Sequence, residues 1–151
     1  MENTDSVQLK TYIESHPSRV WKTISTAQGM KEWLGAKEYE PKVGGKIRFE
    51  VGGDSPRFII TGTVKEMIIE KKLSFTWLEE KVGEYKWPTS TLVTITLTPF
   101  HTGTLVILEH SGFRDLPSEI ALTEFLGHLT GWTMYFYPFS NLMACVEKHG
   151  S

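Results

Sequence analysis

One histidine in this chain of 151 residues holds a position from which it could act on a bound molecule. Residues 103–110 have the composition of a strand, and side chains on one face of a strand recur every two residues, so His110 shares a face with Val106 and Leu108. If this face lines a cavity, the imidazole could orient a hydroxyl or carbonyl group of a ligand, or exchange a proton near neutral pH. The alternative is a structural histidine that bonds to the backbone at the end of the strand. Glu109 points to the opposite face, so these two neighbours do not form a catalytic dyad.

Glu124 and His128 are four residues apart, which places both at one edge of a predicted helix. This spacing suits two metal ligands, but no third ligand follows at a spacing that the helix could use. A hydrogen-bonded pair on the surface is the favoured interpretation, and we predict no metal site and no cofactor. We also predict no catalytic residue, because the chain lacks a Gly-x-Ser-x-Gly nucleophile motif and its glycine pairs at 44–45 and 52–53 do not belong to a phosphate-binding loop.

The element that must position Glu124 and His128 is one long amphipathic helix, from Ser118 to about Lys148. Its large apolar residues recur at intervals of four and three residues, which is the rhythm of one helical face. They are Phe125, Leu129, Trp132, Phe136, Phe139, Met143 and Val146. Since no other stretch of the sequence offers so long a helix, this helix is expected to lie across whatever sheet the rest of the chain forms.

The preceding part of the chain alternates in the manner of a sheet. A first strand, Val7–Ile13, is followed by two short helices, one beginning at Pro17 and one capped by Thr26 and ending at Gly35. Gly62, inside a later strand, indicates a bulge or a close approach of two backbone segments. Short turns between consecutive strands favour antiparallel pairing. The later strands are predicted at residues 46–51, 58–69, 73–77, 92–99 and 103–110.

This order predicts an α+β fold, in which the long C-terminal helix lies across an antiparallel sheet of about six to seven strands. We expect a cavity between that helix and the sheet. Alternation along the strands and spacing along the helix place a set of candidate ligand-binding residues on its walls, most of which also form the core. The candidates are Trp33, Phe49, Phe75, Trp77, Ile95, Val106, Leu108, His110, Phe125, Leu129, Trp132 and Phe136.

The composition bears on which partners the protein could bind and in which compartment it is expected. The net charge is −2, with 16 basic and 18 acidic residues interspersed, so no basic surface is expected to bind nucleic acid. Cys145 is the only cysteine and cannot form an intramolecular disulfide. The polar N-terminus lacks a signal peptide, and no apolar run approaches the roughly 20 residues that cross a bilayer. We therefore expect one domain, residues 1–151, in the cytoplasm and without membrane insertion.

Several short motifs, taken in their order, resemble one superfamily. They are Pro17 with Val20-Trp21, Trp33-Leu34, Pro41-Lys42-Val43-Gly44-Gly45, Ile47-Arg48-Phe49, Gly62-Thr63-Val64, Leu73-Ser74-Phe75-Thr76-Trp77, Gly103-Thr104, His110-Ser111-Gly112-Phe113 and Gly131-Trp132. The chain is similar from Val7 to Val146 to the START-like superfamily, also called SRPBCC or helix-grip. Within it the chain resembles the branch related to the activator of the 90-kDa heat-shock protein ATPase.

The resemblance implies a seven-stranded sheet that curls around the long C-terminal helix, with an internal pocket. Members of the superfamily bind lipids or hormones, cyclise polyketides or stimulate chaperones, so the fold does not name an activity. The chaperone activators also carry a separate N-terminal domain. This chain has no room for one, which argues against chaperone activation.

We therefore expect non-catalytic binding of a small apolar molecule, lipid-like or aromatic and polyketide-like, between the long helix and the sheet. One alternative is an enzyme of the cyclase or aromatase type, in which His110 or a tyrosine moves a proton in the same pocket. Another is a module that stimulates a chaperone ATPase through a surface patch. The identity of the ligand and the oligomeric state stay open.

Overall fold

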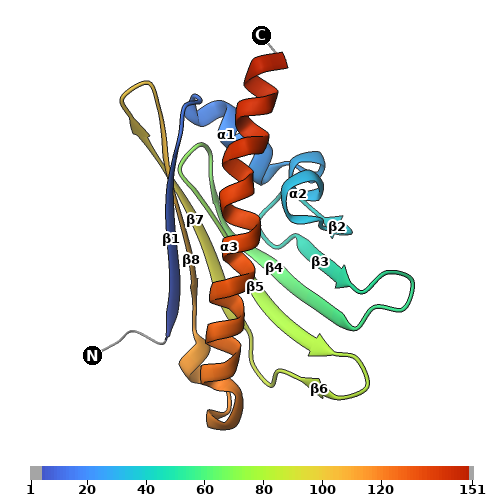
Figure 1. Ribbon diagram of the computed structural model, residues 1–151. Coiled ribbons are helices and arrows are strands. Elements are labelled where there is room, and N and C mark those ends of the chain that lie inside the picture. Colours follow the sequence, from blue (N-terminus) through green and yellow to red (C-terminus); the bar gives the residue numbers. More distant parts are fainter. Residues whose placement is uncertain (1–4, 150–151) are drawn as a thin grey trace.

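The computed structural model describes residues 5–149, with side chains described for residues 5–139. A strand, two short helices, seven further strands, a short 3₁₀ helix and a long helix follow one another (Figure 1). In chain order they are β1 (Ser6–Ile13), α1 (Pro17–Ser25), α2 (Ala27–Leu34), β2 (Glu38–Tyr39), β3 (Lys46–Val51), β4 (Phe58–Ile68), β5 (Lys72–Lys81), β6 (Tyr85–Lys86), β7 (Thr91–Phe100), β8 (Gly103–Ser111), the 3₁₀ helix (Phe113–Asp115) and α3 (Ser118–His149).

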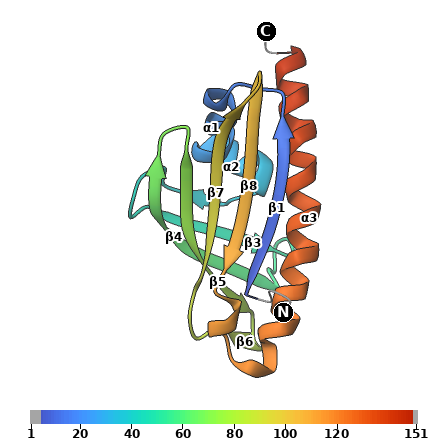
Figure 2. The same cartoon turned by 90° about the vertical axis from the view of Figure 1, so that its left-hand side faces the viewer.

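The strands of the described part form one eight-stranded antiparallel sheet in the order β1-β8-β7-β5-β4-β3-β2, with β6 paired to β5. Helix α3 lies across one face of this sheet, and α1 and α2 lie beside its C-terminal half (Figures 1 and 2). Strands β1, β7 and β8 run alongside α3, whereas β3, β4 and β5 run obliquely to it (Figure 1). This arrangement confirms the α+β helix-grip fold expected from the sequence.

The short helices begin and end at residues whose chemistry favours those positions. Pro17 opens α1, and Nδ1 of the preceding His16 accepts a hydrogen bond from the Ser18 amide at 3.1 Å. Thr26 caps α2 by accepting a bond from the Gly29 amide, also at 3.1 Å. Gly35 ends α2 in the left-handed conformation, with φ at 78°. These short helices bring Leu34 to the sheet face that α3 covers.

Gly62 lies where two strands meet closely. A Cβ atom at this position would collide with the backbone oxygen of Thr76 on the neighbouring strand β5. The pairing of β4 with β5 shifts register two residues later, between Val64 and Glu66. The expectation of a close backbone approach at Gly62 is therefore confirmed, and the shift in register lies just beyond it.

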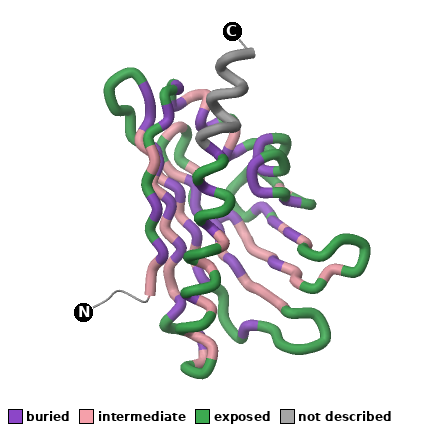
Figure 3. Tube along the Cα trace, in the orientation of Figure 1, coloured by how far each residue is buried: buried purple, intermediate pink, exposed green. Residues whose placement is uncertain are grey.

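The core lies between α3 and the sheet. Buried and partly buried residues alternate along β7 and β8, while α3 shows exposed residues on its outer side (Figure 3). On β5 the buried row Leu73, Phe75 and Trp77 faces the helix side of the core. Alternation along this strand places Glu79 next in the same row.

The predicted elements match those of the structure to within a few residues at their ends. The exceptions are β2, β6 and the 3₁₀ helix, which are too short to carry a periodic pattern. The side chains of Met143, Cys145 and Val146 lie outside the described residues. None of the helices within residues 5–149 combines the length and the apolar character that crossing a membrane requires.

Candidate functional site

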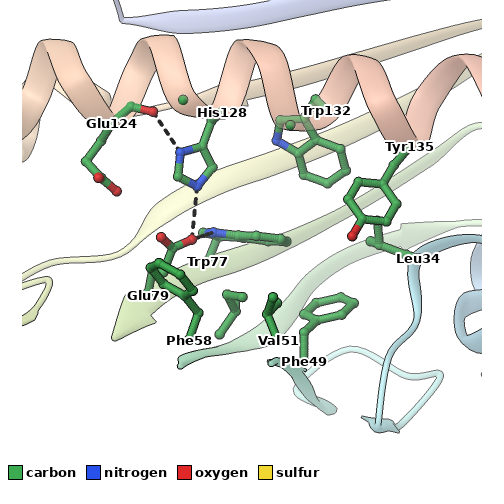
Figure 4. Close-up of a pocket in the computed structure, with 13 residues that line it drawn as sticks. Leu34, Phe49, Val51, Phe58, Trp77, Glu79, Glu124, His128, Trp132 and Tyr135 are labelled. Carbon is green, nitrogen blue, oxygen red and sulfur yellow. Dashed lines mark hydrogen bonds and ion pairs between the residues drawn. The ribbon is translucent and has the colours of Figure 1, made fainter. Parts of the chain in front are cut away.

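A pocket of about 340 Å³ lies between α3 and the oblique strands of the sheet (Figure 4). Its lining is mostly apolar and aromatic, with a cluster of two carboxyl groups and an imidazole at one end (Figure 4). The lining residues are Leu34, Phe49, Val51, Phe58, Ile60, Trp77, Glu79, Glu124, Gly127, His128, Gly131, Trp132 and Tyr135. Apolar walls with a few polar groups are typical of a site for a small molecule.

Two glycines make room for the pocket on the helix side. Gly127 and Gly131 are one turn apart on α3, and a Cβ atom added at either would meet no heavy atom within 4 Å. Glycine in a helix interior costs about 0.5–1 kcal/mol relative to alanine. The helix therefore carries two unfavourable residues at the places where it borders empty space.

Aromatic rings from both the helix and the sheet line the pocket. The rings of Trp77 on β5 and Trp132 on α3 have centroids 5.3 Å apart and planes inclined at 52°. Phe49 on β3 packs against Trp77 at the same centroid distance. Such rings offer flat apolar surfaces that contact a planar ligand with little loss of side-chain freedom.

The polar end of the pocket centres on His128. Its Nδ1 lies 2.7 Å from the backbone oxygen of Glu124, and its Nε2 lies 3.0 Å from Oε1 of Glu79 (Figure 4). A carbonyl oxygen only accepts, so Nδ1 carries a hydrogen. A proton must also lie between Nε2 and Glu79, since a bare lone pair facing a carboxylate would be repelled. Trp77 donates to the same oxygen of Glu79 at 3.3 Å.

The pKa values of His128 and Glu124 both lie above their ordinary values. Burial alone would lower the pKa of His128, but the hydrogen bond and negative charge of Glu79, with smaller contributions from Glu124, raise it above its ordinary value. Burial raises the pKa of the Glu124 carboxyl, and the nearby charge of Glu79 raises it further. The His128 shift thus comes from its acidic neighbours, whereas the Glu124 shift comes first from burial.

Glu124 and His128 were interpreted from the sequence as a surface pair without a third partner. That interpretation is wrong, because only 13% of the His128 side chain is exposed and Glu79 supplies a third group. The three residues bring one potential ligand atom each within 4.8 Å of one another. Spacing along the helix could not reveal Glu79, since it comes from β5. The expectation that no metal binds is not tested by this geometry and stays a prediction.

His110 has a different environment from the one expected. It is fully buried and does not line the pocket. Trp132 donates its indole N–H to Nδ1 of His110 at 2.8 Å, and Nε2 lies 2.6 Å from the hydroxyl of Thr91. Both ring nitrogens are thus bonded inside the protein. His110 is therefore a structural histidine, but its partners are the side chains of Trp132 and Thr91 and not the backbone, as the structural alternative had assumed. It does not reach the pocket to orient a ligand directly.

The other sequence candidates separate into three groups. Phe49, Trp77 and Trp132 line the pocket. Trp33 is buried against Phe139, with ring centroids 5.2 Å apart, and borders an adjoining groove. The buried core, outside the pocket lining, holds Phe75, Ile95, Val106, Leu108, Phe125 and Phe136.

Leu129 belongs to none of these groups. The prediction that it faces the sheet is wrong, because 37% of the residue is exposed. His128 takes the inward position instead, and its burial is compensated by bonds to Glu79 and to the helix backbone. The lining residues that sequence reasoning did not assign to the pocket are chiefly Glu79, Gly127, His128 and Gly131. The available signals were the continuation of the inward row of β5 to Glu79 and the four-residue spacing of the glycines.

A comparison with protein families matches residues 14–144 to the family described as "Activator of Hsp90 ATPase homolog 1-like protein". A comparison with curated proteins gives no match.

Solved structures share the fold over nearly the whole chain. Protein MLL2253 from Mesorhizobium loti is 26% identical, with a TM-score of 0.75 over 92% of this chain and 96% of that one. The Aha1 dimer from Colwellia psychrerythraea is 17% identical, with a TM-score of 0.68 over 91% of this chain and 95% of that one. DynU16, a putative protein in the dynemicin biosynthetic locus, is also 17% identical, with a TM-score of 0.71 over 97% of this chain and 48% of that one.

Proposed function

The chain belongs to the family of Activator of Hsp90 ATPase homolog 1-like proteins, and from this premise we propose that it binds a small, largely apolar aromatic molecule between α3 and the sheet. The binding is non-catalytic. The ligand lies with its ring system between Trp77 and Trp132 on one side and the apolar residues of β3 and β4 on the other.

The observation that carries this proposal is the pair of glycines on α3. A helix that only had to cover the core would gain stability from alanine or a larger residue at Gly127 and Gly131, since both positions face open space. Instead, this space is bordered by Trp77, Trp132 and Phe49. A ligand that fills this space removes the apolar surface of these walls from water.

The dimensions favour a compact ligand. Pockets for drug-sized molecules measure roughly 300–1,000 Å³, and the volume of about 340 Å³ lies near the lower end of that range. One to three fused rings are therefore a better match than a long acyl chain. Aromatic walls favour planar rings for the same reason.

The test is an NMR titration of the full chain with naphthylmethanol, a neutral compound with two fused rings. We expect saturable shifts of the Trp77 and Trp132 indole signals and of the Gly127 and Gly131 amides. In the variant Gly131→Leu, the added side chain occupies the pocket and should abolish these shifts.

The matched control places the same side chain on the neighbouring exposed position. Thr130 is exposed on α3 and does not line the pocket, so Thr130→Leu should bind naphthylmethanol like the unaltered chain. Equal binding by Gly131→Leu and Thr130→Leu, or the absence of shifts at the pocket, would contradict the proposal.

A further inference from the structure

We propose that the pocket prefers aromatic molecules that carry a protonated amine, and that the amine binds at the end formed by Glu79 and Glu124. This inference rests on the proposed function, because it assigns a chemical class to the ligand of the same pocket. It also narrows the ligand to molecules with an apolar ring body and a cationic end.

The first argument is the charge of the lining. Glu79 and Glu124 are its two acidic residues, and none of the described residues that line the pocket is Lys or Arg. Even with His128 protonated, two carboxylates and one imidazolium leave one negative charge uncompensated. Lys81 acts on Glu124 through its charge, but it does not line the pocket and pairs with Glu84 at 3.0 Å. The polar end therefore has a deficit of positive charge.

The second argument is the closeness of the two carboxyl groups. Glu79, Glu124 and His128 bring their polar atoms within 4.8 Å of one another. Two carboxylates at such a distance repel, and partial burial strengthens the repulsion because the local dielectric constant is low. An ammonium group between them relieves that repulsion, whereas a hydroxyl group only donates one hydrogen bond.

The third argument is the hydrogen-bonding capacity of Glu79. His128 and Trp77 both bond to its Oε1, so neither bond requires its second carboxylate oxygen. A carboxylate accepts about four hydrogen bonds. An incoming N–H donor can thus bond to Glu79 without displacing His128, and charge-assisted bonds of this kind are stronger than neutral ones.

The aromatic walls fix which end of the ligand meets the carboxylates. Trp132, Tyr135 and Phe49 lie along the pocket beyond His128, away from Glu79 (Figure 4). A ring system covered by these side chains points its substituent toward Glu79 and Glu124. A carboxylate substituent in the same place would meet two like charges.

The experiment compares three compounds with the same rings: naphthylmethylamine, which is protonated at neutral pH, naphthylmethanol and naphthoate. Their dissociation constants are measured by calorimetry on the full chain at neutral pH and low salt. The amine is expected to bind about tenfold more tightly than the alcohol, as one charge-assisted hydrogen bond allows. Naphthoate is expected to bind most weakly.

Variants test whether Glu79 and Glu124 cause the preference for the amine over the alcohol. Glu79→Gln and Glu124→Gln should each lower the ratio of amine to alcohol affinity, and the double variant should bring it close to one. Glu80→Gln is the matched control, because Glu80 follows Glu79 on β5, points to the opposite face and does not line the pocket. It should retain the preference.

A salt titration of the unaltered chain gives a readout that does not depend on the folding of variants. Added salt should weaken binding of the amine and leave binding of the alcohol nearly constant, since screening acts on the charged pair. Equal affinities for amine and alcohol, or tightest binding of naphthoate, would overturn the amine preference and leave the proposed function intact. Absence of binding by all three compounds would overturn both.

Discussion

Trp132 donates its indole N–H to Nδ1 of the buried His110 across 2.8 Å. Because Nδ1 accepts this bond, Nε2 carries the hydrogen of the neutral ring and donates it to the hydroxyl of Thr91 at 2.6 Å. Thr91 in turn donates to the backbone oxygen of Trp77 at 3.1 Å. One histidine in the core thus holds the two tryptophans that form the pocket walls, and it acts as a positioning residue.

The bond between His110 and Trp132 should be visible as an energetic coupling. His110→Leu leaves the indole N–H and the Thr91 hydroxyl without this partner, and should lower the free energy of unfolding by about 2–3 kcal/mol. Trp132→Phe removes the donor and leaves Nδ1 of His110 unpaired. The double variant removes both partners, so urea unfolding of the four proteins should show a coupling of about 1 kcal/mol. Strict additivity would contradict the bond.

His110 should also make the fold sensitive to acid. Burial, followed by the charge of His128, lowers the pKa of His110 well below its ordinary value of 6.5. As the pH falls below 6.5, the unfolded chain takes up a proton at this residue and the folded chain does not. The stability contribution is therefore complete above that pH and is lost progressively below it. Urea unfolding of His110→Leu should depend less steeply on pH in this window than unfolding of the unaltered chain. Parallel profiles would contradict the assignment.

Local chemistry made most of the fold predictable. Pro17, Thr26 and Gly35 mark helix ends through their own backbone and side-chain preferences, and the structure uses them in those roles. The strands follow from alternation, which burial of one sheet face imposes on the sequence. A glycine inside a strand indicates a bulge or a close backbone approach, and at Gly62 the close approach is the one found.

The pocket was less predictable because its key residues break the pattern of the elements that hold them. Leu129 has the polarity expected of the inner helix face, yet His128 occupies that face since Glu79 on β5 compensates for its burial. That compensation depends on a contact between residues 49 positions apart. Gly127 indicates open space only once the sheet opposite it is known. A tertiary contact and an empty volume leave no periodic signal in a sequence.

The glycines of α3 should tolerate alanine, in contrast with a packed helical glycine. Gly131→Ala is expected to raise the free energy of unfolding by about 0.5–1 kcal/mol, because the methyl group enters open space and alanine favours the helix. Gly29→Ala in α2 is the control, since its Cβ would collide with the backbone oxygen of Thr23. Urea unfolding should show opposite signs for the two changes. Destabilisation by Gly131→Ala would mean that the pocket is not open.

His128 should respond to pH in the sense opposite to His110. Burial acts to lower its pKa, but its bond to Glu79 and the nearby negative charges raise it above 6.5. As the pH rises, the unfolded chain therefore loses the proton of His128 at a lower pH than the folded chain does. The stability contribution of His128 is complete below pH 6.5 and is lost as the pH rises through the higher pKa of the folded state.

Titration of the imidazole carbon-bound protons by NMR should give His128 a midpoint above 6.5, and Glu79→Gln should move that midpoint down. Burial alone disfavours the charged imidazole, so the raised pKa needs an acidic partner. An unchanged His128 midpoint in Glu79→Gln would show that Glu79 is not the group that raises this pKa.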